Sequence, residues 1–271
     1  MTSLKSIVDA ASAARYDARM LVQRALAVAA CLTAVLASAG LSSAASGGEG
    51  RAPLPAGSKL RIVGITSEVY LTRASGNDVT VRASFTGPDA ARFALRIEHD
   101  ASGVTICDVR RDDAGASCDR QSDRNDRKAT ARFDVGVPSG ARVDASVVDG
   151  RIEARGIDAT LTASTVDGPI DVDATQIRSL HTVNGPIAAR LTRAPSQPIS
   201  IGATSGDIDL NLPRGAYGLS ATSVSGRISS SSTQIAVSRN FVGSTAAASL
   251  GGGGPEISIA TVSGHIAMSL R

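Results

Sequence analysis

The stretch Thr165-Val166-Asp167-Gly168-Pro169-Ile170 occurs, with small changes, six times in this 271-residue chain. The other copies are Val147-Val148-Asp149-Gly150-Arg151-Ile152, Thr182-Val183-Asn184-Gly185-Pro186-Ile187, Ala203-Thr204-Ser205-Gly206-Asp207-Ile208, Ser223-Val224-Ser225-Gly226-Arg227-Ile228 and Thr261-Val262-Ser263-Gly264-His265-Ile266. The steps between successive glycines are 18, 17, 21, 20 and 38 residues. Such a period is typical of a solenoid, because each unit is too small to bury its apolar face alone. The last step spans two periods, which predicts a degenerate copy around Phe241-Val242-Gly243.

Apolar and polar residues alternate around each copy, as in Leu161-Thr162-Ala163-Ser164-Thr165, which predicts strands with one buried face. Stacking in register predicts an inward core ladder formed by Ile152, Ile170, Ile187, Ile208, Ile228 and Ile266. A second inward ladder is expected from Val148, Val166, Val183, Val224 and Val262, with a distortion at the fourth copy, which has Thr204 in this slot.

The glycine of each copy lies where the chain must turn or bulge, a position that often needs positive φ. The predicted turn residues are Gly150, Gly168, Gly185, Gly206, Gly226 and Gly264. Asp-Gly and Asn-Gly pairs also suit the two-residue turns of hairpins. The fixed period favours stacked rungs over separate hairpins.

Residues 60–145 also alternate, but less regularly, and a charged loop at 108–128 interrupts them. The predicted fold class is therefore all-β: a β-solenoid or parallel β-helix-like stack of repeats about 19 residues long, with a less regular β N-terminal part. We expect a single domain over 60–271, with clear repeats over 143–271.

These repeats, together with Val137-Pro138-Ser139-Gly140 and the Gly251–Gly254 stretch before Ile257-Ser258-Ile259, resemble the putative-adhesin family of bacterial β-strand-repeat domains of unknown function. They are similar in style to head-GIN-domain envelope proteins. The resemblance covers about 60–271. It implies a β-solenoid or parallel β-helix-like envelope protein without an agreed activity.

The N-terminus has the features of an export signal. Basic residues precede the apolar run ALAVAACLTAVLASA at 25–39, which ends in a small-x-small cleavage site. We expect a signal peptide over 1–39, with Met20 as a possible true start, and a flexible Ser/Gly/Ala/Pro linker over 40–59. Two alternatives remain: an uncleaved membrane anchor at 25–45, or lipid attachment at Cys31.

Cys107 and Cys118 flank a charged, turn-like segment. Outside the cytosol such a pair favours a disulfide, and two cysteines without a nearby His fall short of a zinc ligand set. The three histidines, His99, His181 and His265, are expected at the surface. We predict no catalytic, cofactor-binding or metal-binding residues and no cofactor.

Carboxylates at outward positions are the remaining candidates for chemistry: Glu153, Asp171, Asp173, Asp207 and Asp209. A glycosidase would need two acids at a productive separation. Ala188 is expected between Asp171 and Asp209 on neighbouring rungs, so it interrupts the row of carboxylates. The scarcity of aromatic residues, 3% of the chain, also disfavours a sugar-binding groove.

Charge narrows the class of partner. Without residues 1–39, the chain has 24 basic and 23 acidic side chains, a balance that does not suit nucleic acid. We expect a non-enzymatic periplasmic or secreted envelope protein, structural or adhesin-like, whose partner is an envelope protein, a glycan or a second copy. Membrane contact is expected only if 25–45 stays as an anchor. The alternatives are a secreted carbohydrate-active β-helix enzyme and a membrane-anchored envelope-sensing module.

Overall fold

The computed structural model describes residues 47–119, 128–240 and 243–271. The predicted signal peptide and Cys31 lie outside these residues, as do Phe241 and Val242. Within them, no helix is long and apolar enough to cross a membrane. The predicted linker over 40–59 is wrong in its second half, because Glu49–Pro53 forms a strand that pairs with residues 78–82.

Strands account for nearly all the regular structure. Their bounds, with one short 3-10 helix, are β1 (Glu49–Pro53), β2 (Lys59–Arg73), β3 (Asp78–Thr86), η1 (Ala90–Arg92), β4 (Phe93–Asp100), β5 (Gly103–Arg110), β6 (Thr130–Val137), β7 (Arg142–Asp167), β8 (Ile170–Asn184), β9 (Ile187–Leu191), β10 (Ile199–Ser205), β11 (Ile208–Leu212), β12 (Tyr217–Ser225), β13 (Ile228–Ser230), β14 (Ala236–Arg239), β15 (Ser244–Leu250), β16 (Glu256–Ser263) and β17 (Ile266–Leu270).

Each repeat contributes one strand segment before its glycine and one after it. The segments before the glycines pair in parallel and form what we call the upstream sheet; its rungs are β12, β16, β10 and the ends of β8 and β7. The segments after the glycines form the downstream sheet, which contains β13, β17, β11, β9 and the start of β8. The β2 and β7 strands run through both sheets.

The predicted isoleucine ladder is continuous and buried. Ile152 pairs with Ile170, Ile170 with Ile187, and Ile187 with Ile208. All six ladder side chains are at most 4% exposed. Val69 of β2 pairs with Ile152 and extends the column toward the N-terminal part.

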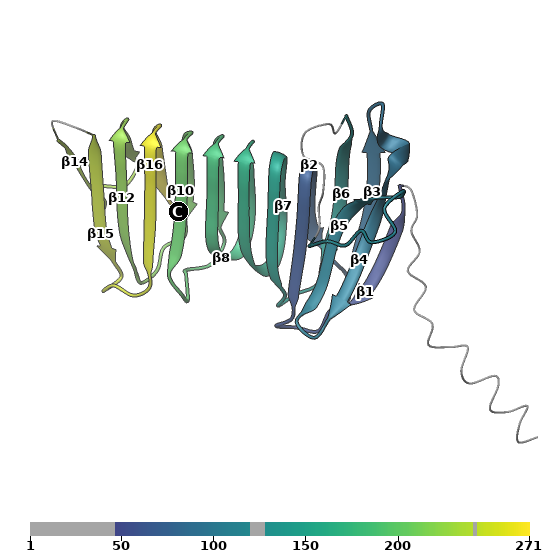
Figure 1. Ribbon diagram of the computed structural model, residues 1–271. Helices are drawn as coiled ribbons and strands as arrows, with labels where there is room; N and C mark the ends of the chain where they lie inside the picture. The colour runs from purple at the N-terminus through teal and green to yellow at the C-terminus, as the bar shows by residue number, and fades with distance from the viewer. Residues whose placement is uncertain (1–46, 120–127, 241–242) are drawn as a thin grey trace, which may run out of the picture. The chain divides into compact units, whose positions relative to one another are not determined.

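The order of the rungs differs from the order of the sequence. Ile266 pairs with Ile208 on one side and with Ile228 on the other. Figure 1 shows the last long strand, β16 in yellow, between β10 and β12. The last repeat in the sequence is therefore not the last rung of the stack, because it is inserted one rung inside.

The antiparallel hairpin β14–β15 explains this insertion. β15 runs antiparallel along β12, and β16 then runs parallel on the other side of β12. The connection passes through Gly251–Gly254, which all have positive φ. The predicted degenerate copy near Gly243 is consequently not a parallel rung, since β15 begins at Ser244 in the opposite direction.

Hydrogen bonds continue through the corner between the sheets. The Gly185 N–H donates to the Ser205 carbonyl at 2.9 Å, and the Ile187 N–H donates to the Asp207 carbonyl at 2.9 Å. These bonds keep neighbouring backbones at the usual strand spacing of about 4.8 Å. The glycine of each motif copy has no room for a side chain, because a Cβ there would overlap a carbonyl oxygen of the next rung. The glycine–oxygen pairs are Gly150–Ser67, Gly168–Gly150, Gly185–Gly168, Gly206–Gly185, Gly264–Gly206 and Gly226–Gly264.

Close approach is thus common to all six glycines, whereas the predicted positive φ is not. Gly150, Gly168, Gly185 and Gly264 have φ between 142° and 159°. Gly206 and Gly226 lie outside the left-handed region, so a turn conformation does not explain them. The physical reason shared by the six positions is the lack of room for a side chain.

The first slot of the motif has a role that the sequence reading missed. In three of the six copies its hydroxyl donates to the carbonyl of a neighbouring motif glycine, as Ser223 does to Gly264 at 2.9 Å and Thr261 does to Gly206 at 3.2 Å. Both hydroxyl residues are at most 2% exposed. The signal available was the recurrence of Thr or Ser in a slot that alternation places in the core.

The N-terminal part closes the other end of the stack with antiparallel strands. β5 and β6 pair in parallel with the two halves of β2, and β4 and β3 then pair antiparallel with β5 and β6. Cys107 of β5 is bonded to Cys118, with a Cα–Cα distance of 5.5 Å. This less regular part therefore continues both sheets.

The corner can be tested with one methyl group. We expect Gly206→Ala to lower the free energy of unfolding by about 1–3 kcal/mol or more, because its Cβ meets the rigid Gly185 carbonyl. Gly76→Ala is the matched control, since Gly76 has neither a positive φ in the left-handed range nor a neighbour near its Cβ position. Chemical denaturation checks both variants. Equal stability of the two would show that crowding does not select glycine at the corner.

The rung order makes a second prediction. Ile187→Ala and Ile266→Ala should each cost about 2–5 kcal/mol, because both side chains have ladder neighbours on two sides. Ile228→Ala should cost less, because β13 pairs with β17 alone. Denaturant unfolding of the three variants measures the ranking. A small loss at Ile266 with a large one at Ile228 would contradict the inserted rung.

Candidate functional site

The outer faces of the two sheets differ in chemistry. The downstream face is rich in charged side chains, whereas on the upstream face of the repeats the charged side chains, such as Arg178 and Glu256, lie near the start of the strands and the rows beyond them are uncharged. This contrast defines the candidate site.

Three rows of side chains cross the outer face of the upstream sheet, and we call them the neutral face. Strand register aligns them at the spacing of the rungs. The rows are Thr162, Ser179, Ser200, Ser258 and Ser220; Ser164, His181, Gly202, Ala260 and Thr222; and Val166, Val183, Thr204, Val262 and Val224. No Asp, Glu, Lys or Arg occurs among them.

The valine row corrects the second predicted ladder. Val166, Val183, Val224 and Val262 are 41–52% exposed, so they face solvent. The alternation slips at the corner, where Asp167 beside Val166 is also exposed. The fourth copy, with Thr204 in this slot, keeps the same register as its neighbours, and the expected distortion is absent there.

Ion pairs link the rungs of the downstream face. Arg155 donates to Glu153 at 2.9 Å and binds both oxygens of Asp171 on the next rung, at 3.0 and 2.6 Å. The bonds with Asp171 raise the pKa of the Arg155 guanidinium. Bidentate pairing of this kind fixes side-chain geometry.

Two of the other candidate carboxylates, Asp173 and Asp207, also have structural partners. Asp173 lies 3.8 Å from the Arg190 guanidinium, and Asp207 accepts a bond from the His265 backbone N–H at 2.7 Å. Ala188 pairs with both Asp171 and Asp209, so it separates these acids as the sequence indicated. The sheet therefore brings Glu153 and Asp171 together around one arginine and keeps Asp209 apart.

The histidines occupy surface positions within strands and turns. His181 Nε2 lies 3.5 Å from the Ser200 hydroxyl on the neutral face. The other ring nitrogen, Nδ1, lies over Gly202. A Cβ added to Gly202 would be 2.9 Å from this nitrogen. His265 Nδ1 accepts from the Arg227 backbone N–H at 3.1 Å. In the part of the chain that the structure describes, no cluster of His, Cys, Asp and Glu could hold a metal ion.

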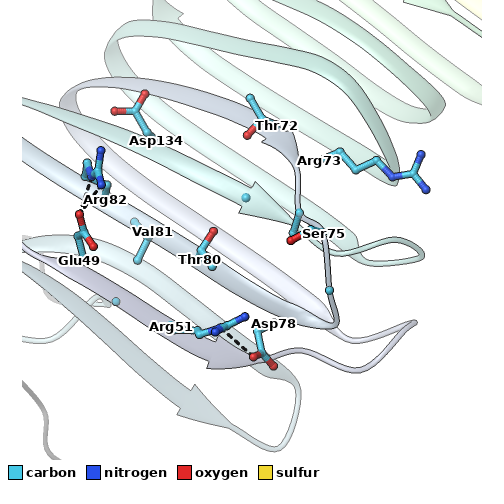
Figure 2. A pocket seen from close by; sticks show the side chains of 14 residues that line it. Glu49, Arg51, Thr72, Arg73, Ser75, Asp78, Thr80, Val81, Arg82 and Asp134 are labelled. Atoms are coloured by element: carbon cyan, nitrogen blue, oxygen red, sulfur yellow. Dashed lines mark hydrogen bonds and ion pairs between the residues drawn. The ribbon is translucent and has the colours of Figure 1, made fainter.

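A groove of about 740 Å³ lies over β1, β3, β6 and the end of β2. Figure 2 shows two ion pairs along it, Arg51–Asp78 and Arg82–Glu49. Arg73 and Asp134 complete its charged lining. Its arginines and carboxylates are equal in number, so the groove has no net charge to attract an ionic ligand.

Comparison with known proteins identifies the family. A model of the family described as Toastrack DUF4097 matches residues 66–269. This chain belongs to that family. The match confirms the predicted β-solenoid-like class and the resemblance to an adhesin-like family of unknown function.

Two solved structures are similar to this Toastrack chain. One, described as a putative cell adhesion protein from Clostridium sporogenes, is 10% identical with a TM-score of 0.45, over 83% of this chain and 99% of that chain. Another, a putative adhesin from Bacteroides fragilis, is 13% identical with a TM-score of 0.29, over 82% and 96% of the two chains. No curated protein matches the chain.

The outward valine row can be tested with an isosteric change. Val262→Thr should alter the free energy of unfolding by less than about 0.5 kcal/mol, because the side chain is 52% exposed. Val172→Thr makes the same chemical change at a 1% exposed position and should cost about 1–3 kcal/mol. Thermal or chemical denaturation distinguishes them. A larger loss at Val262 would show that the row packs against something.

Proposed function

We propose that this chain is an exported, non-enzymatic module of the cell envelope that works as an adhesin-like interaction domain. The neutral face carries the proposal. Its three rows contain uncharged side chains on five successive rungs, whereas the ion pairs of the same sheet lie beyond these rows, as between Lys59 and Asp144. A regular, uncharged face suits a partner with a flat or repetitive surface.

Two features support export. The sequence pattern at 25–39 predicts a cleaved leader. The bond between Cys107 and Cys118 suits an oxidising compartment such as the periplasm or the cell exterior. These features also support partners drawn from the envelope: another protein, a glycan or a second copy.

The arrangement of the carboxylates supports a binding role over hydrolysis. A glycosidase needs one acid free to protonate a leaving group and a second acid across the scissile bond. Glu153 and Asp171 are instead joined through Arg155, whose guanidinium donates to both carboxylates. This arrangement suits a structural role, in which the two carboxylates hold neighbouring rungs together through Arg155.

Export can be tested by expressing the full chain in a bacterium and fractionating the cells. We expect the periplasmic or secreted product to begin between Gly40 and Ser46, with an intact mass that lacks the two thiol hydrogens of Cys107 and Cys118. A full-length product in the cytosol would contradict the proposal.

The interaction face is tested in the same cells with a photo-cross-linking residue. Placed at the exposed position Ser258 of the neutral face, it should give a cross-linked envelope product that is lost when the protein is retained in the cytosol. The matched control is the exposed position Asp209 on the downstream face. Equal products from both positions would show that the neutral face has no special role.

A further inference from the structure

A hollow of about 680 Å³ opens at the end of the upstream sheet where its strands begin. Consecutive rungs contribute to it: Lys59 starts β2 and pairs with Arg142, which starts β7. Thr160 follows, with its N–H donating to the Ala141 carbonyl at 3.0 Å. Arg178 of β8 completes its basic lining.

Arg178 reaches the hollow because the strand register slips there. Leu161 pairs with Ile177, but the next residue, Thr162, pairs with Ser179. Arg178 is thus the extra residue of a β-bulge. Bulges are common beside functional sites, where they redirect a side chain.

Positive charge in the hollow exceeds the negative charge that faces it. The Lys59 ammonium is bound to the Asp144 carboxylate at 3.1 Å. Asp100 also faces Lys59, and hydrogen bonds from the Ser102 side chain and backbone lower its pKa, so this carboxyl stays ionised. These two acids more than offset Lys59, and the guanidiniums of Arg142 and Arg178 bring the five side chains to a net charge of +1.

Both guanidiniums keep free donors. Arg142 Nε donates to the Gly57 carbonyl at 2.7 Å, and one Nη of Arg178 lies 3.4 Å from the Gln197 side-chain oxygen. Among the residues that the structure describes, neither has a carboxylate within ion-pair distance. An arginine has five N–H donors, so each can still bind an oxyanion through two of them.

Hydroxyl groups surround the two guanidiniums. Thr160 and Thr162 line the hollow. Thr162 also starts the row of the neutral face that continues through Ser179 and Ser200. A ligand anchored in the hollow would therefore meet a track of hydroxyls at the rung spacing.

We propose that this hollow binds an acidic polysaccharide, with a carboxylate or phosphate group held between Arg142 and Arg178 and sugar hydroxyls on Thr160 and Thr162. The proposal names the ligand class for the interaction function proposed above and rests on it. In the described part of the chain, the exposed large apolar side chains are Val166, Val183, Val224, Val237 and Val262, and none lines the hollow. A lipid surface or a protein hot spot would need such apolar anchors.

The test measures binding of fluorescent oligosaccharides to the purified exported protein by anisotropy. The probes are a galacturonate oligomer for carboxylate, a glycerol-phosphate oligomer for phosphate, and a dextran oligomer of the same length as the neutral control. We expect at least one acidic probe to bind, more weakly at higher salt, and dextran to bind far less. Arg178→Gln should weaken binding about tenfold, since it removes a charge-assisted contact.

Two further variants show whether the loss of affinity in Arg178→Gln is specific to this position and whether it depends on the guanidinium. Arg190→Gln removes an arginine of similar exposure on the downstream sheet and should leave affinity unchanged. Arg178→Lys keeps the charge but loses the planar fork, and its affinity should fall between wild type and Arg178→Gln. Failure of both acidic probes to bind, equal binding of dextran, or wild-type affinity in Arg178→Gln would each overturn the site. The proposed envelope function would survive that result, since its own test depends on export and cross-linking.

Discussion

The close approach of neighbouring backbones at the glycine corner is the constraint on which the rest of the structure depends. Hydrogen bonds run from rung to rung on both sides of the corner, at Gly185 and at Ile187. They leave no space for a Cβ between one glycine and the carbonyl of the next. In three of the six copies a buried hydroxyl then supplies a donor to that carbonyl, as Thr182 does to Gly168 at 3.4 Å. Glycine, hydroxyl and isoleucine thus belong to one structural unit.

This unit also explains which features could be predicted from the sequence. The period and the isoleucine column follow from residues that repeat in every copy, so the fold class and most of the core could be read directly. The valine slot misled because strict alternation fails at the corner, where Val166 and Asp167 are both outside and Ile170 is inside again. Alternation counted back from Ile170 across Gly168 therefore places Val166 in the core, whereas the structure places its side chain at the surface.

The order of the rungs could not be predicted, for a reason inherent in repeats. Each copy presents the same column and the same backbone bonds, so any rung can stack on any other. Ile266 pairs with Ile208 and with Ile228, although its copy is the last one in the sequence. The choice depends on the 38-residue connection, whose antiparallel strand β15 covers the outer edge of β12. Sequence similarity among the copies therefore conceals their spatial order.

The candidate site was equally hidden, because it combines a regular surface with one irregularity. The polar residues of the neutral face looked like ordinary outward positions and its valines were assigned to the core, while Arg178 is exposed only through a register slip between Leu161 and Thr162. Neither feature has a motif. Yet a repeating face offers a polymer many equivalent contacts, and weak contacts that share one chain reinforce each other through effective concentration. On the proposal made above, the charged anchor at the start of the upstream strands would set the register of a polymer, and the neutral rows beyond it would let the polymer lie along the rungs without repulsion. Anchor and rows belong to the same sheet, and Thr162 is part of both.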